Sequence, residues 1–221
     1  MKQLVIVGAG GLGRQALTQL VADYAHGTEW LVAGYLDERG PDVVPVDSVF
    51  PWLGYPALFE PGPQHVFVCA VGNPQRRRLQ VEPLLARGAQ FVPVRTRCYL
   101  DLRTRFGATF FGYDVSAGVD CRIGDYGFIE QQTLLGHDVS VGDYVHISPR
   151  CIVAGYVNIG NEVTIHSGAL LSRGITVGDG AVIGMGAVVL RNVPPGATVL
   201  GNPARVISIN PDVGDDSPGV I

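Results

Sequence analysis

Apolar residues recur at every sixth position over much of the second half of the chain. Fourteen positions in one phase, from Phe111 to Val189, are all apolar, and twelve of them are Ile, Leu or Val. With 47% hydrophobic residues in the chain, such a run has a chance probability on the order of 1 in 10^4 to 10^5. A hexapeptide period is typical of a parallel β-helix, in which three six-residue flats make one triangular coil. The pattern therefore predicts nearly five coils.

Two other columns of the repeat carry small residues. Four positions after each aliphatic residue, from Val115 to Val193, the side chains are small or β-branched, and one position after it glycine occurs in eight of fourteen cases. We expect the aliphatic residues to fill the interior and the small residues to fit beside the corners. We expect the glycines to supply backbone angles that residues with a Cβ resist. Residues 18 apart should stack at roughly the strand spacing of 4.8 Å.

The first 97 residues show a different pattern, in which strand-like apolar runs alternate with helical spacing. Residues 4–7 are continuously apolar, as in a strand buried on both faces, and further strands are expected near 30–36, 65–71 and 90–94. Helices are expected after the first strand and from Pro74, and the proline-rich segment 39–63 is expected to hold one short helical turn. This alternation predicts a parallel sheet with right-handed crossovers.

The glycines after the first strand match a nucleotide-binding turn. Gly8, Gly10 and Gly13 form G-x-G-x-x-G between a strand and a helix, and Asp37 ends the second strand. The glycine amides and the helix N-terminus favour a phosphate, and Asp37 can accept hydrogen bonds from a ribose. Taken alone, the motif suggests NAD. A half-sized domain without a hydride-transfer partner better fits one nucleotide carrying a sugar, and a turn that only packs helix on strand is the alternative.

The charge, apolar segments and cysteines of the chain argue against several kinds of binding partner and location. The net charge is −4, the pI is about 5.7, and no basic run is longer than residues 76–78, which argues against nucleic acid and anionic membranes. The apolar start is too short for a secretory signal, and no segment approaches the ~18 residues that span a bilayer. Four scattered cysteines without C-x-x-C spacing favour a reducing cytoplasm.

His137 is the strongest candidate for chemistry in the repeat. It lies two positions after interior Leu135 and so should point outward, with Gly155 and Arg173 one and two coils above it. A histidine beside a bare glycine can act as a general base while the glycine N–H stabilises an oxyanion. This geometry leaves room between His137 and Arg173 for a slim chain to pass.

Two further histidines lie in the repeat. His146 is nine residues after His137, half a coil round the prism, so the two cannot meet within one chain. In a threefold assembly, opposite faces of neighbouring copies would bring them together. His166 follows an interior isoleucine and stacks on Ser148. Arg205, in a Gly-Asn-Pro-Ala-Arg segment, can meet a phosphate group as a charge-assisted donor, and a solvated arginine is the alternative.

A half-Rossmann domain joined to a left-handed β-helix resembles the NeuD/PglD-like sugar acyltransferases of bacterial surface-glycan synthesis. The resemblance covers nearly the whole chain, and it is carried by residues 8–13, Asp37 and residues 70–73, 136–138, 145–148 and 201–205. It implies transfer of an acetyl group from acetyl-CoA to an amine or hydroxyl of a sugar that is often nucleotide-linked. It also implies a trimer with active sites between neighbouring β-helices.

The resemblance also implies roles for single residues. His137 falls on the catalytic base, Asp138 on its acidic neighbour, and Gly155 where an N–H meets the thioester oxygen. With the repeat geometry, the expected acyl-CoA contacts are His146, Gly155, His166, Arg173 and Arg205. The expected nucleotide-sugar contacts are Gly8, Gly10, Gly11, Leu12, Gly13, Asp37, Glu38, Gly72 and Asn73. Leu12 departs from the family, which often has histidine there.

The sequence therefore predicts three segments: a half-Rossmann nucleotide-sugar-binding domain (1–97), a left-handed β-helix acyltransferase domain (98–209) and a disordered tail (210–221). The predicted activity is N-acetylation of a nucleotide-linked amino sugar by acetyl-CoA, without a metal, in a cytoplasmic homotrimer that binds no nucleic acid and does not insert into membranes. Three alternatives stay open: O-acetylation of a sugar hydroxyl, a metal-dependent β-helix hydrolase or hydratase using His146 and His166, and a non-catalytic nucleotide-sugar-binding protein.

Overall fold

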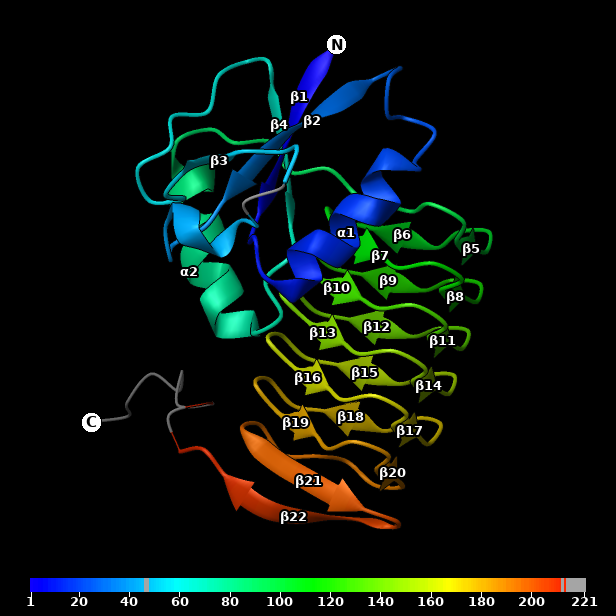
Figure 1. Ribbon diagram of the computed structural model, residues 1–221. Coiled ribbons are helices and arrows are strands. Elements are labelled where there is room, and N and C mark those ends of the chain that lie inside the picture. Colours follow the sequence, from blue (N-terminus) through cyan, green and yellow to red (C-terminus); the bar gives the residue numbers. More distant parts are fainter. Residues whose placement is uncertain (46–47, 212, 214–221) are drawn as a thin grey trace, which may run out of the picture.

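The computed structural model describes residues 1–45, 48–211 and 213. An α/β domain lies at one end of a column of stacked β-coils, and a β-hairpin closes the other end (Figure 1). The predicted fold class, a Rossmann-like parallel sheet followed by a parallel β-helix, is confirmed. Most of the predicted tail, 210–221, lies outside the described residues. Within the described part of the chain, no helix has the length and apolar character needed to cross a membrane.

The N-terminal domain contains a parallel sheet with the strand order β3-β2-β1-β4. Its strands are β1 (Lys2–Val7), β2 (Trp30–Leu36), β3 (Trp52–Gly54) and β4 (His65–Cys69). Its helices are α1 (Gly11–Val21), the 3-10 turn η1 (Pro41–Val43) and α2 (Pro74–Ala86). Leu4 and Ile6 of β1 pack in the cluster that contains Leu20 of α1, and Val5 packs in the cluster that contains Leu84 of α2. Burial on both faces explains the continuous apolar run of β1.

The fourth strand differs from the prediction. Residues 90–94 form only isolated bridges, Phe67 with Phe91 and Val94 with Phe110, because this segment leaves the sheet for the β-helix and Pro93 has no N–H to donate. The fourth strand is instead β3, within the proline-rich segment. It has three residues, which is too short for an apolar period to be recognised.

The β-helix has three parallel sheets, one on each flat of the prism. The first sheet contains β7 (Phe110–Phe111), β10 (Phe128–Ile129), β13 (His146–Ile147), β16 (Thr164–Ile165), β19 (Val182–Ile183), β21 (Ala197–Gly201) and the antiparallel β22 (Ala204–Ile209). The second sheet contains β5 (Tyr99–Leu100), β8 (Ser116–Ala117), β11 (Leu134–Leu135), β14 (Ile152–Val153), β17 (Leu170–Leu171) and β20 (Val188–Val189). The third sheet contains β6 (Arg105–Phe106), β9 (Arg122–Ile123), β12 (Ser140–Val141), β15 (Asn158–Ile159) and β18 (Thr176–Val177).

Successive coils align as the period predicts. Leu135 pairs with Val153 in the second sheet, for example, and Ile147 pairs with Ile165 in the first. The aliphatic column and the small column form one continuous buried core from Phe111 to Val199. The coils begin earlier than the apolar period, at β5.

The eight glycines that directly follow interior positions do not supply unusual backbone angles, as the sequence had suggested. None of these eight glycines has a left-handed φ; a Cβ on Gly136 would instead lie 2.6 Å from the backbone nitrogen of Gly155. Left-handed φ occurs two residues later, where non-glycine residues such as Asp138 (φ 57°) stand in the upper coils and glycines such as Gly174 (φ 74°) in the lower ones. Glycine at the first position therefore allows close approach of the next coil.

This explanation can be tested with two glycines of the same β-helix. In Gly142→Ala the new Cβ would lie 2.8 Å from the carbonyl carbon and oxygen of Gly160 in the next coil, so we expect a loss of about 1–3 kcal/mol in the free energy of unfolding. In Gly174→Asn the site is open and Asn tolerates a left-handed φ, so the cost should stay below about 1 kcal/mol. Urea denaturation measures both, and equal losses would contradict the close-approach explanation.

Candidate functional site

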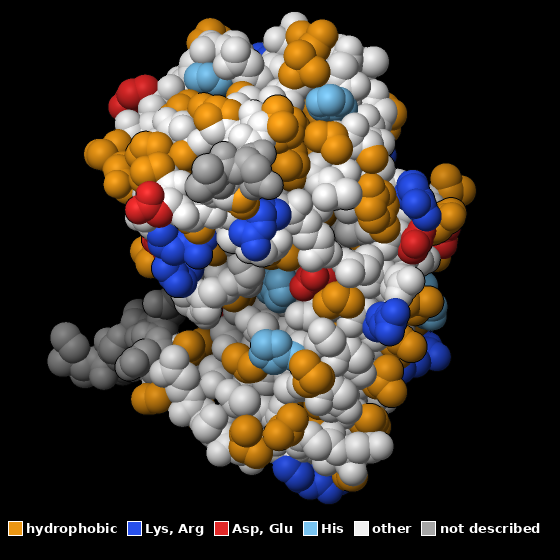
Figure 2. All heavy atoms as spheres, viewed as in Figure 1, with side chains coloured by type: hydrophobic (Ala, Val, Ile, Leu, Met, Phe, Trp, Pro, Cys, Tyr) orange, Lys and Arg blue, Asp and Glu red, His pale blue; other side chains and the backbone are white. Residues whose placement is uncertain are grey.

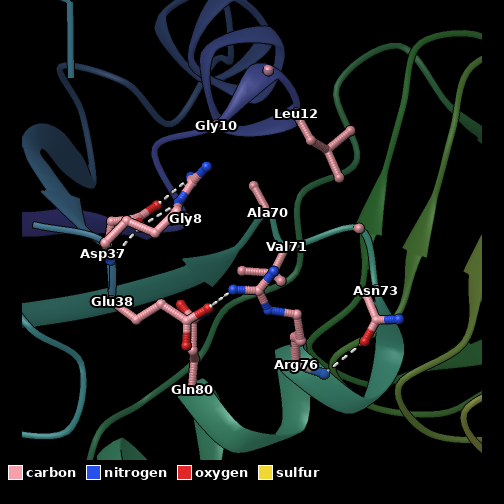
Figure 3. Close-up of a pocket in the computed structure, with 13 residues that line it drawn as sticks. Gly8, Gly10, Leu12, Asp37, Glu38, Ala70, Val71, Asn73, Arg76 and Gln80 are labelled. Atoms are coloured by element: carbon pink, nitrogen blue, oxygen red, sulfur yellow. Dashed lines mark hydrogen bonds and ion pairs between the residues drawn. The ribbon is translucent and has the colours of Figure 1, made fainter. Parts of the chain in front are cut away.

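A pocket of about 270 Å³ opens at the carboxyl ends of β1, β2 and β4, where ligands bind in parallel α/β sheets (Figure 3). The predicted nucleotide-sugar residues that line it are Gly8, Gly10, Gly11, Leu12, Asp37, Glu38, Gly72 and Asn73. Gly13 does not line it. A Cβ on Gly13 would lie 2.0 Å from the Gly8 carbonyl oxygen, so this glycine allows α1 to pack against the turn.

The start of α1 can hold an anion. Gly10 caps the helix without a side-chain hydrogen bond, and the first turn contains no acidic residue. A Cβ on Gly11 would meet nothing within 4 Å, so space is open in front of the helix end. Free N–H groups and the helix dipole there favour a phosphate group.

Asp37 is less available to a ligand than the motif suggests. Its carboxylate accepts hydrogen bonds from the Ala9 N–H (2.7 Å) and from the Arg39 side chain (2.8 and 2.9 Å), and its side chain is 3% exposed. Burial raises the pKa of Asp37, but the hydrogen bonds from Arg39 and Ala9 outweigh it and hold the pKa below its usual value. A ribose hydroxyl would have to compete with Arg39 for this carboxylate.

Three lining residues carry no sequence signal. Arg39 extends across the glycine turn, within 3.1 Å of the Cβ position on Gly10, and Arg76 forms an ion pair with Glu38. Gln80 is four residues after Arg76 on α2, so both side chains reach the same pocket. Its spacing of four residues from Arg76 is the one sequence feature that could have indicated that Gln80 lines the pocket.

Arg77, the next residue on α2, joins the pocket loop to the β-helix. Its side chain is fully buried and donates hydrogen bonds to the carbonyl oxygens of Val71 (2.7 Å) and Gly72 (3.3 Å) in the loop. It also donates to the carbonyls of Tyr126 (2.9 Å) and Val145 (3.0 Å) in the β-helix. Burial lowers its pKa to about 10, so the guanidinium stays charged at neutral pH.

His146 lies beneath Arg77, and not on an exposed flat. Arg77 Nη2 lies 3.2 Å from His146 Nδ1, and His146 Nε2 lies 3.2 Å from Glu130 Oε1. Because a guanidinium only donates, Nδ1 must accept, and the proton of the neutral ring is on Nε2, from which it is donated to Glu130. Both ring nitrogens are therefore engaged. Burial lowers the pKa of His146 and Glu130 partly offsets this effect.

His137 stands at a corner after β11, on the second sheet. Its Nδ1 lies 2.8 Å from Asp138 Oδ2, and a Cβ on Gly155 would lie 2.8 Å from its Nε2. The ring thus rests directly on the Gly155 backbone. Tyr156, which the sequence did not single out, packs edge-to-face with the His137 ring, with the two ring centroids 4.9 Å apart. The Arg173 guanidinium carbon lies over the Tyr156 ring, 4.8 Å from its centroid.

The expected acyl-CoA residues do not all lie together within one chain. Gly155 and Arg173 flank the His137 corner, whereas His146 is on the first sheet under the N-terminal domain. His166 is exposed after β16 of that same sheet. Arg205 is exposed on β22 in the closing hairpin. In Figure 1, α2 lies beside the first sheet and β11 lies at the opposite edge of the column.

The metal-hydrolase alternative finds no supporting ligand set. Among the described residues, no group of three or more His, Cys, Asp and Glu side chains could hold a metal ion. His146, which that alternative needed, already uses both ring nitrogens. In Figure 2, histidine and acidic side chains are visible in the hollow between the two domains.

Comparisons with known proteins cover both domains. Residues 3–84 match the PglD N-terminal domain family. The acetyltransferase domain of PglB from Neisseria gonorrhoeae in complex with acetyl coenzyme A is 28% identical, with a TM-score of 0.82 over 93% of this chain and 99% of that chain. PerB from Caulobacter crescentus in complex with CoA and GDP-perosamine is 25% identical, with a TM-score of 0.82 over 94% of this chain and 98% of that chain. No curated protein sequence matches the chain.

The buried His146 predicts how stability depends on pH. Its pKa is lower in the folded chain than the usual 6.5, so the unfolded chain binds the proton more readily and stability falls as the pH drops below about 6.5. The charge of Arg77 and nearby His166 also lower the pKa of His146, whereas Glu130 raises it. The carboxamide in His146→Gln can accept a hydrogen bond from Arg77 and donate one to Glu130, but it does not titrate. We therefore expect the free energy of unfolding to fall less on acidification in this variant than in the native chain.

The measurement is the free energy of unfolding of both proteins at about pH 7.5 and pH 5.5, on either side of the ordinary histidine pKa. The pKa of His65 is also lowered by burial, and it contributes equally to both proteins. A variant as sensitive to acid as the native chain would show that His146 is not the titrating group.

Proposed function

We propose that this chain, whose N-terminal domain matches the PglD N-terminal family and whose fold matches that of PglB, is a NeuD/PglD-like acetyl-CoA-dependent N-acetyltransferase of a nucleotide-linked amino sugar. The domain match and the similarity to acetyltransferases over nearly the full length support the acyl-transfer reaction. The complex of PerB with CoA and GDP-perosamine supports a nucleotide-linked amino sugar as acceptor. The four free cysteines support the proposed location in a reducing cytoplasm.

The observation that carries this proposal is the His137–Asp138 hydrogen bond beside Gly155. With its Nδ1–H donated to Asp138, the neutral His137 ring has its lone pair on Nε2, where a base is needed. The Gly155 N–H makes no hydrogen bond to any described residue, so it is available to an oxyanion. A base and an oxyanion donor therefore stand next to each other on one corner.

The proposed reaction is direct transfer. The acceptor amine attacks the thioester carbonyl carbon of acetyl-CoA, and its proton passes to His137 Nε2 as the C–N bond forms. The oxyanion of the tetrahedral intermediate accepts a hydrogen bond from the Gly155 N–H. The C–S bond then breaks, and the proton on His137 passes to the CoA thiolate. Asp138 holds the ring in the required tautomer and stabilises its charged form.

Acetyl-CoA is the co-substrate in this proposal, as its presence in the PglB complex supports. Gly155 and Arg173 border the path of the thioester beside His137, and Arg205 is an exposed cation that can meet a CoA phosphate. His146 has no free ring nitrogen to offer acetyl-CoA, because both of its nitrogens are already engaged within the chain.

The proposed active site needs two chains. The nucleotide pocket is joined through Arg77 to the first sheet, whereas His137 is on a corner of the second sheet. An acceptor in the pocket thus faces away from the base of its own chain (Figure 1). We propose a homotrimer in which the acceptor held by one chain meets His137 of a neighbour.

Removing the base tests the chemistry. We expect His137→Ala to lower kcat by about 10^2- to 10^4-fold and Asp138→Asn to lower it less, since the amide keeps the shape but not the charge. CoA thiol release from acetyl-CoA, with a panel of nucleotide-linked amino sugars as acceptors, measures this. His26→Ala in the N-terminal domain is the control. Native kcat in His137→Ala would place the base elsewhere.

Mixing two inactive variants tests the shared site. His137→Ala keeps an intact pocket, and Gly11→Glu places a carboxylate in the open space where a phosphate is expected, while keeping His137. If base and pocket come from different chains, refolding the two variants together should restore part of the activity that each lacks alone. Sedimentation equilibrium should show a trimer. No recovery in mixed trimers, or a stable monomer, would contradict the shared site.

A further inference from the structure

The carboxamide of Gln80 is buried in the wall of the nucleotide pocket without a partner. The residue is 5% exposed, and its Oε1 has no hydrogen-bond partner among the described residues. It lines the pocket together with Glu38 and Arg76. A buried acceptor left unpaired opposes folding, so such a group in a pocket wall suggests a ligand that supplies the missing donor.

The position of Gln80 indicates which part of a ligand it meets. Figure 3 shows Gly10 and Gln80 at opposite ends of the pocket, with the Gln80 side chain extending from α2 beside Glu38. Phosphates belong at the Gly10 end, where α1 begins. The sugar that is acylated must leave the pocket to reach His137. The end beside α2 is therefore left for the nucleoside.

The charged residues beside Gln80 also favour a neutral ligand group at this end of the pocket. Glu38 and Arg76 form an ion pair with each other, so neither charge is left uncompensated beside Gln80. A carboxamide offers one acceptor and one donor side by side, and a half-turn about its last torsion exchanges them. The polar edge of a nucleobase presents an N–H next to an acceptor, which complements this group.

We propose that Gln80 is the residue that reads the nucleobase of the acceptor, through hydrogen bonds between its carboxamide and the polar edge of the base. The inference rests on the proposed function, because it assumes that a nucleotide-linked sugar occupies this pocket. It adds that the base is recognised by α2, and not by Asp37, whose carboxylate is engaged by Ala9 and Arg39.

The test compares two substitutions on the same helix. Gln80→Leu keeps the bulk of the side chain and removes both polar atoms, whereas Gln75→Leu makes the same change at an exposed position that does not line the pocket. GDP, UDP, ADP and CDP are titrated separately into the native chain by calorimetry. For the tightest of them we expect Gln80→Leu to weaken binding about 10-fold and Gln75→Leu to leave it unchanged.

Two further readouts separate recognition from a structural effect. Gln80→Leu should melt no lower than the native chain, because it removes an unpaired buried acceptor. Methylation of the ring N–H of the preferred base, or of its exocyclic amino group, should weaken binding to the native chain but weaken it much less in Gln80→Leu. Such a cycle assigns the lost affinity to contact between Gln80 and the base.

The outcomes distinguish the two levels of proposal. A selective loss in Gln80→Leu, together with the analogue result, supports the base-reading role. Equal nucleotide affinity in the native chain and Gln80→Leu overturns this role and leaves the proposed function standing. If no nucleoside diphosphate binds the native chain while acetyl-CoA does, the nucleotide-linked acceptor and the role of Gln80 are both overturned.

Discussion

The arrangement of the two domains depends on one buried guanidinium. Removing the charge of Arg77 from water is costly, and no carboxylate of a described residue pairs with it directly; backbone carbonyls of the pocket loop and of two β-helix coils form its hydrogen bonds instead. Hydrogen bonds to a charged group are worth about 1.5–3 kcal/mol each, so the full set can offset the burial. Because the acceptors belong to both domains, the guanidinium is satisfied only when the domains are packed together. It also sets the tautomer of His146.

The same backbone positions serve both the coil architecture and the proposed chemistry. Asp138 occupies the corner position where φ is left-handed at every sixth residue from Asp114 to Gly186, and its carboxylate lies beside the His137 ring. Gly155 lacks the side chain that would displace the same ring. The base, its orienting partner and the oxyanion donor thus come from ordinary features of a β-helix corner. What is specific to this chain is the choice of residues on the corner.

The repeat could be predicted from sequence because its interior is determined locally: every sixth side chain enters one core, as Leu135 and Val153 do. The positions of Gly155 and Arg173 above His137 could be predicted from the same period, because residues 18 apart stack on each other. The reason for the glycine column was wrong, since contact between coils is not visible in a period. The strand predicted at 90–94 is only partly formed: Phe91 bridges Phe67 of β4, but Val94 pairs across the domain boundary with Phe110. Arg77, Gln80 and Tyr156 were missed because their partners are set by tertiary packing. The roles of the site residues stay predictions.

The register between coils also restricts how the chain can change length. Each coil hydrogen-bonds to residues 18 positions away, as Asp125 does with Asp143 and Asp143 with Asn161. An insertion of a few residues within a flat would turn interior side chains outward in every later coil, unless it bulged out as a loop. Gain or loss of one whole coil between Arg173 and the hairpin would preserve every pairing above it. Homologues are therefore expected to differ in height by complete coils, with extra sequence confined to corners.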